Sequence, residues 1–125
     1  MEFPEDLKYS EEHEWVSVQD TVATIGITDY AQGELGDLVF VELPKVGDEA
    51  TQSESVGTIE AVKAVSDLFS PVSGKVVEVN EKLNDAPETV NQDPYGDGWM
   101  VKIEMSDTSE LDNLLDANAY KDKIS

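Results

Sequence analysis

The chain has 125 residues, the size of a single domain with one core, so we treat residues 1–125 as one domain. Its 28 acidic side chains outnumber its 8 lysines, arginine is absent, and the formal net charge is −20. This balance excludes nucleic-acid binding, which needs a basic face to displace counterions, and the absence of cysteine excludes disulfides and thiolate chemistry.

Apolar residues recur mostly with the two-residue spacing of β-strands. The first two predicted strands are joined near residues 19–20, and Pro44 closes the third. The predicted strands span residues 15–18, 22–27, 38–43, 56–59, 72–79 and 99–105. The chain is therefore mainly β.

Two helices are predicted. Thr28 is a typical N-cap residue, and Gly33 and Gly36 end the following helix within two turns. Near the C-terminus, Asp107 followed by Glu110 has the pattern of a capping box. One apolar stripe then predicts a helix that runs to about residue 121: Leu111, Leu114 and Leu115. Residues 84–98 are rich in Asp, Pro, Asn and Gly and predict a loop.

A short internal repeat relates residues 36–41 to residues 74–79, with a spacing of 38 positions. Two similar halves of short strands suit a small sandwich with approximate twofold symmetry. We therefore expect a flattened barrel-sandwich hybrid with a short internal helix and a C-terminal helix.

Lys63 lies near the middle of the chain, between two apolar stretches, where a hairpin tip is expected. A lysine in such a turn is accessible from all sides, although most exposed lysines serve only solubility. Its surroundings resemble the attachment site of lipoyl domains, which place an acidic residue shortly before the lysine and a glycine eleven positions after it. The matching residues are Glu60, Lys63, Asp67 and Gly74. Biotin carriers typically flank the lysine with methionine, whereas Val62 and Ala64 stand here.

The resemblance extends beyond the hairpin to the glycine cleavage H-protein family, over roughly residues 7–120. The segments that carry it are residues 7–9, 13–16, 23–31, 36–37, 41–44 and 98–100. Ordinary lipoyl domains lack both the strand that begins His13-Glu14-Trp15 and the C-terminal helix.

The resemblance implies a lipoyl carrier with lipoate bound covalently to Lys63, and recognition for lipoylation through Glu60 and Gly74. It implies that Glu14 and Asp67 hold the aminomethyl nitrogen of the loaded arm. The implied partners are the glycine decarboxylase, the aminomethyltransferase, the dihydrolipoyl dehydrogenase and a lipoate-attaching enzyme, and we expect a monomer.

Two other classes are weighed against the carrier. A lipoate donor or a non-carrier interaction protein on the same scaffold is not separated from the shuttle by sequence. An enzyme is disfavoured because no serine has an identifiable base partner, and the single histidine, His13, excludes a histidine metal cluster.

Surface charge and the absence of targeting segments bear on the compartment in which the protein works. The acidity suits a well-solvated surface, steering toward basic partners, or adaptation to high salt, which the exclusive use of lysine weakens. No run approaches the about 20 apolar residues of a membrane span, and the acidic first residues do not form a secretory signal. We expect a cytoplasmic protein of a bacterium or archaeon, or a mitochondrial-matrix protein if the chain is a mature eukaryotic form.

Overall fold

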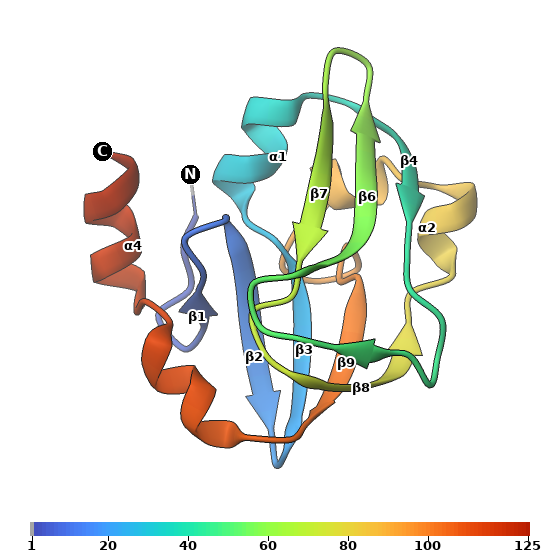
Figure 1. Cartoon of the computed structure of the whole chain (residues 1–125). Helices are drawn as coiled ribbons and strands as arrows, with labels where there is room; N and C mark the ends of the chain where they lie inside the picture. The colour runs from blue at the N-terminus through green and yellow to red at the C-terminus, as the bar shows by residue number, and fades with distance from the viewer. Residues whose placement is uncertain (1) are drawn as a thin grey trace.

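Two antiparallel sheets form the framework of the computed structural model, which describes residues 2–125 (Figure 1). The larger sheet has the order β1-β2-β3-β9-β8-β5 and the smaller one the order β4-β6-β7. The strands are β1 Lys8–Tyr9, β2 Glu14–Gln19, β3 Val22–Ile27, β4 Leu38–Glu42, β5 Glu49–Ala50, β6 Ser55–Ala61, β7 Val65–Phe69, β8 Gly74–Val79 and β9 Val101–Met105. The expected mainly-β fold is confirmed, as a sandwich of two sheets and not a closed barrel.

The core lies between the sheets, because strands of both contribute buried side chains to one cluster. The larger sheet supplies Val16, Ile25 and Ile103, and the smaller one supplies Ile59 and Leu68. Along β9, buried residues alternate with more exposed ones, in the two-residue spacing from which this strand was predicted.

The internal repeat places one copy in each sheet, at β4 and β8. Both copies carry a register shift at the same repeat position, which leaves Val39 out of the β4 ladder and Val77 out of the β8 ladder. Bulges at equivalent positions support the two-half architecture more strongly than the sequence repeat alone.

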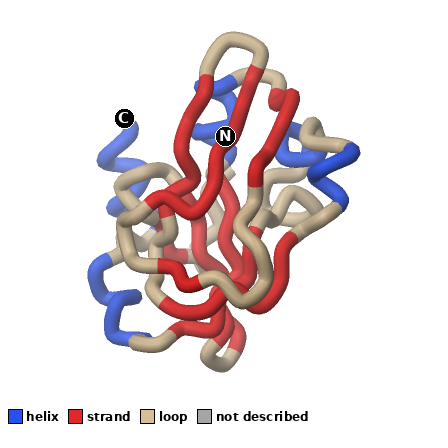
Figure 2. Tube along the Cα trace, turned by 45° about the vertical axis from the view of Figure 1, so that its right-hand side comes forward, coloured by secondary structure: helices blue, strands red, loops and turns tan. Residues whose placement is uncertain are grey.

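The helices lie outside the two sheets (Figure 2). They are α1 Asp29–Leu35, α2 Lys82–Asp85, α3 Thr89–Gln92, the 3-10 helix η1 Thr108–Asn113 and α4 Ala117–Ile124. Thr28 caps α1 as predicted, since its hydroxyl accepts the Ala31 N–H at 3.1 Å. The helix ends before Gly36, whose φ of 81° is in the left-handed region, and Gly33 lies inside it. No helix within residues 2–125 is long and apolar enough to cross a membrane.

One predicted helix boundary was wrong, and the segment predicted to be rich in loop contains short helices. The segment predicted as a loop at residues 84–98 contains α3 and the end of α2. The single helix predicted from Asp107 to about Lys121 is divided into η1 and α4.

Tertiary contacts explain the division of the C-terminal helix. The Glu110 carboxylate accepts the N–H of Ser73 at 2.6 Å and its hydroxyl at 2.7 Å, so it does not complete a capping box. Leu115 then pairs with Tyr9, with the two N–H···O distances at 2.7 and 2.8 Å, which requires extended backbone where the helix was expected. Asp116 caps the separate helix α4 by accepting the Ala119 N–H at 2.8 Å.

The α4 helix is held against the larger sheet by a second, aromatic cluster. Tyr9 and Tyr120 stack with ring centroids 4.8 Å apart, and Leu7, Trp15 and Ala117 complete the buried set.

Gly74 offers a test of backbone packing in the larger sheet. A Cβ at this position would lie 2.0 Å from the carbonyl oxygen of Glu104, so Gly74→Val should lower the free energy of unfolding by about 3 kcal/mol or more. Gly33→Ala is the control, because nothing lies within 4 Å of its added Cβ inside α1; it should stabilise by about 0.5–1 kcal/mol. Urea unfolding measures both, and a Gly74→Val variant as stable as wild type would contradict the packing argument.

Candidate functional site

Lys63 stands at the tip of the β6–β7 hairpin, the loop that projects at the top of Figures 1 and 2. The hairpin closes with the Ala61 N–H donating to the Ala64 carbonyl at 2.8 Å, so Val62 and Lys63 occupy the turn. Lys63 is exposed. The sequence placed the lysine correctly, although the returning strand of the hairpin is β7 and not the predicted strand at residues 72–79.

The tip rests on the turn that follows α1. The Val62 N–H donates to the Asp37 carbonyl at 3.1 Å. A Cβ on Gly36 would lie 3.0 Å from Cε of Lys63, so glycine leaves room for the lysine stem. The hairpin tip is therefore fixed in direction while its amine stays in solvent.

A cleft of about 300 Å³ lies between α1 and the hairpin. Its apolar lining comes from Ile27, Ala31, Leu35 and Ile59, and its polar lining from Glu12, His13, Glu14, Tyr30, Glu34, Ser66 and Asp67. Leu35 directly precedes Gly36, so the lysine side chain stands near one end of this cleft. The structure thus brings Glu14 and Asp67, which the sequence predicted as arm-holding residues, to one cavity.

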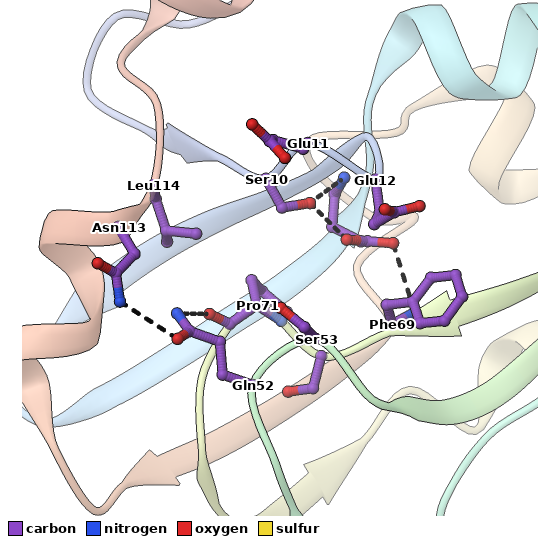
Figure 3. Close-up of a pocket in the computed structure, with 11 residues that line it drawn as sticks. Ser10, Glu11, Glu12, Gln52, Ser53, Phe69, Pro71, Asn113 and Leu114 are labelled. Atoms are coloured by element: carbon purple, nitrogen blue, oxygen red, sulfur yellow. Dashed lines mark hydrogen bonds between the residues drawn. The ribbon is translucent and has the colours of Figure 1, made fainter.

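Glu14 is almost fully buried, with 2% of its surface exposed. The Ser10 hydroxyl donates to Oε1, and the Phe69 N–H donates to Oε2 at 3.4 Å; Figure 3 marks both bonds. Burial raises the pKa of Glu14 to about 8, against the lowering effect of the Ser10 and Phe69 hydrogen bonds. The carboxyl group is therefore mostly protonated at neutral pH in the empty cleft.

Glu14 also borders a second cavity, of about 240 Å³, on the side away from α1. Figure 3 shows this cavity with Ser10, Gln52 and Asn113 around it. The Gln52 side chain is held there by the Pro71 carbonyl at 2.9 Å. Glu14 thus lines both cavities.

The Asp67 carboxylate does not point toward Glu14. Asp67 pairs with Thr58, whereas its neighbour Ser66 pairs with the buried Ile59, so alternation places the Asp67 side chain on the outer face of the sheet. There its Oδ1 lies 3.5 Å from the Ser55 hydroxyl.

The Asp67 backbone, in contrast, faces the cleft. β7 is the edge strand of the smaller sheet. Ala64 forms a hydrogen-bonded pair with Ala61, and every second residue of β7 from Ala64 onward directs its N–H and C=O toward β6. Asp67 is three residues after Ala64, so its N–H and C=O point away from β6. The Phe69 N–H, two residues on, reaches Glu14 in the same direction. Asp67 therefore presents its main-chain carbonyl to the cleft, where it accepts the Ser66 hydroxyl at 3.3 Å.

The two residues predicted for recognition lie in different places. Glu60 is exposed on β6, three residues before the lysine, and pairs with Phe40 and Val65. Gly74 pairs with Met105 in the larger sheet and is not part of the hairpin. The structure brings Glu60, but not Gly74, to the tip.

Sequence reasoning missed the groups that position Glu14. Ser10 was not singled out, because its role depends on the turn at residues 10–13, where His13 has a φ of 71°. The hydroxyl of Tyr120 lies 2.9 Å from Nδ1 of His13 and 2.8 Å from the hydroxyl of Thr28. Burial lowers the pKa of His13, so its ring is neutral at pH 7.

Comparison with known proteins gives a consistent result. The family model described as glycine cleavage H-protein matches residues 7–125. The glycine cleavage system H protein of Staphylococcus haemolyticus is 60% identical over 124 residues, 99% of this chain and 98% of that protein. The corresponding protein of Symbiobacterium thermophilum is 62% identical over 117 residues, 94% of this chain and 91% of that protein. The crystal structure of a glycine cleavage system H protein from Mycobacterium marinum matches with a TM-score of 0.91 at 41% identity, covering 98% of each chain.

A rigid sandwich that holds one lysine in solvent beside a small cleft has the architecture of a carrier protein. The chain belongs to the glycine cleavage H-protein family. It is accordingly a carrier component of the glycine cleavage system and not one of its catalysts, and the interpretation as a non-carrier interaction protein is not favoured.

The buried carboxyl group predicts a pH-dependent stability. The folded protein keeps a proton on Glu14 up to a pKa of about 8, whereas the unfolded chain loses it near 4.5. Between these values the native state binds more protons, so its stability falls as pH rises, by at most about 1.4 kcal/mol per unit. Glu14→Gln, which cannot ionise, should remove this part of the slope. Urea unfolding of both proteins from pH 5 to 9 measures it, and parallel curves would show that Glu14 is ionised throughout.

Proposed function

We propose that Lys63 carries lipoate in an amide bond and that the chain shuttles the aminomethyl group of glycine between enzymes. The observation that carries the proposal is the exposed lysine at the end of a cleft that a buried carboxyl group closes, in a chain of this family.

The residues present fit such a prosthetic group. The chain contains no cysteine, so the sulfur that accepts the aminomethyl group must come from the lipoyl dithiolane. Acylation removes the charge of Lys63, and the cleft offers an apolar surface of Ile27, Ala31 and Leu35 on which an uncharged arm can lie.

Loading adds a protonated amine to the arm, and the cleft is suited to hold it. The Glu14 carboxyl group is neutral in the empty cleft, and an approaching cation lowers its pKa, so docking of the amine releases one proton. The Asp67 main-chain carbonyl supplies a second acceptor from the edge of β7. A charge-assisted hydrogen bond of this kind contributes about 1.5–3 kcal/mol and shields the amine from water.

The partners follow from this cycle. A pyridoxal-phosphate-dependent glycine decarboxylase loads the oxidised arm and releases carbon dioxide. An aminomethyltransferase passes the one-carbon unit to tetrahydrofolate and releases ammonia, and a dihydrolipoyl dehydrogenase reoxidises the dithiol with NAD. A lipoate-attaching enzyme recognises the hairpin with help from Glu60, whereas any effect of Gly74 is indirect, through the packing of β8 against β9 in the larger sheet. The bacterial relatives favour a cytoplasmic location, and we propose that the carrier is a monomer.

Lipoylation should be confined to Lys63. Lys63→Arg keeps charge and length but cannot be acylated, so it should gain no lipoyl mass when incubated with a lipoate–protein ligase, lipoate and ATP. Lys45→Arg, an exposed lysine remote from the hairpin, is the matched control and should be modified like wild type. Intact mass and peptide mapping measure the result. Modification that persists in Lys63→Arg would assign the arm to another residue.

The loaded arm should depend on Glu14 more than on the Asp67 side chain. In lipoylated protein loaded by the decarboxylase, Glu14→Gln should speed the release of formaldehyde and ammonia by about tenfold or more, the effect of losing one charge-assisted hydrogen bond. Asp67→Asn keeps the main-chain carbonyl and should change the rate less than about twofold.

Glu34→Gln is the control for that experiment, because it removes another carboxylate from the same cleft. The double variant Glu14→Gln with Asp67→Asn should behave like Glu14→Gln alone. Equal half-lives of loaded wild type and Glu14→Gln would show that Glu14 does not hold the amine. A large effect of Asp67→Asn would show that the Asp67 carboxylate does hold it.

A further inference from the structure

The outer face of the smaller sheet is apolar next to Lys63. In β4, Leu38 and Val41 are buried, whereas Val39 and Phe40 between them are 53% and 46% exposed. The bulge at Val39 causes this pattern, since an extra residue turns two successive side chains toward solvent.

Phe40 belongs to a row of side chains across the sheet. It pairs with Glu60 on β6, and Glu60 pairs with Val65 on β7, so the three side chains stand side by side on the outer face. Val65 is 66% exposed, and Val62 in the turn is 72% exposed. We call this surface the tip patch: Val39, Phe40, Glu60, Val62 and Val65.

The other half of the molecule shows that the fold does not require such a patch. Val77 occupies the equivalent bulge in β8, and the position equivalent to Phe40 is Glu78. Glu78 forms an ion pair with Lys102 at 3.7 Å, as expected of an ordinary solvated surface. That is the one ion pair formed within residues 2–125, so Glu60 in the tip patch has no cationic partner among these residues.

The position of the patch identifies its occupant. Acylation of Lys63 requires the attaching enzyme to bring its active site to Nζ at the tip, so that enzyme must cover the surrounding surface. The enzymes of the cycle react with the far end of the finished arm, so their chemistry does not require contact with Nζ itself. Because the patch offers apolar side chains on both sides of an unpaired carboxylate, its partner needs an apolar surface with a cation opposite Glu60.

We propose that the tip patch is the docking surface for the lipoate-attaching enzyme, an inference that rests on Lys63 being the lipoylated residue. Phe40 and Val65 are its anchors. Glu60 sets the register of docking by pairing with the enzyme's cation.

The test compares two double variants, each of which replaces two exposed apolar side chains with serine. Phe40→Ser with Val65→Ser removes the anchors, and Val18→Ser with Val77→Ser removes two valines of the larger sheet that are 41% and 42% exposed. With a lipoate–protein ligase, lipoate and ATP, kcat/KM for lipoylation should fall about tenfold or more for the tip variant, through a higher KM. It should stay within about twofold of wild type for the control variant.

A second measurement separates docking of the attaching enzyme from other roles. Each variant is lipoylated to completion with excess ligase, and the decarboxylase-catalysed exchange of the glycine carboxyl group with bicarbonate is followed. The tip variant should exchange within about twofold of wild type. An equal fall in lipoylation and exchange would assign the patch to shared docking and overturn the proposal. Sedimentation of a wild-type dimer that the tip variant lacks would assign it to a second copy and also overturn it.

Fold integrity and the underlying function are checked separately. Thermal unfolding should give the same Tm for wild type and both variants; if the tip variant unfolds, Val65→Thr, which keeps the β-branched shape, should still lower lipoylation. Lipoylation of the tip variant or of Val65→Thr at the wild-type kcat/KM would overturn the docking surface. Absence of lipoyl mass on Lys63 in wild type itself would instead refute the proposed function.

Discussion

The buried Glu14 carboxyl group joins the two sheets at the foot of the hairpin. Glu14 begins β2 in the larger sheet, and its Oε2 accepts the Phe69 N–H from β7 in the smaller one. An ionised carboxylate buried there without a cation would destabilise the fold, so the pKa of about 8 allows the link to form as a neutral hydrogen bond. The same atoms close the cleft, which makes the orientation of the hairpin and the chemistry of the cleft depend on one group.

The turn at residues 10–13, which positions Glu14, is stabilised by contacts with the C-terminal helix α4. The His13 carbonyl accepts the Thr28 N–H at 3.1 Å. The His13 ring and the Thr28 hydroxyl each form a hydrogen bond with the Tyr120 hydroxyl. Tyr120 in turn stacks on Tyr9. Strand β2, which follows His13, and helix α4 go beyond the segments expected of an ordinary lipoyl domain, and they come together at this turn. The additional length of the chain thus supports the cleft wall and not the lysine itself.

The sequence predicted the features that depend on local chemistry and missed those that depend on distant partners. The Thr28 cap, the alternating strands and the exposed position of Lys63 follow from residue type and spacing. The division of the C-terminal helix does not, because Glu110 prefers Ser73, 37 residues away, over its own helix. The direction of the Asp67 side chain also needed the register of the hairpin, since a shift of one residue exchanges the two faces of a strand. The burial of Glu14, which raises the pKa of its carboxyl group, depends on residues of both sheets.

If Lys63 carries lipoate, as we propose, the cleft distinguishes a loaded arm from an empty one without any change of fold. An uncharged lipoyl arm finds mainly apolar contact there, because the Glu14 carboxyl group is protonated and already bonded to Ser10 and Phe69. A loaded arm would bring an ammonium group that ionises Glu14. A charge-assisted hydrogen bond of about 1.5–3 kcal/mol would raise the ratio of docked to free arm by about 10- to 150-fold. Under the proposed function, the reactive cargo is therefore held in the cleft while the empty arm is released to solvent. The titration of one buried carboxyl group thereby couples the charge of the cargo to its exposure.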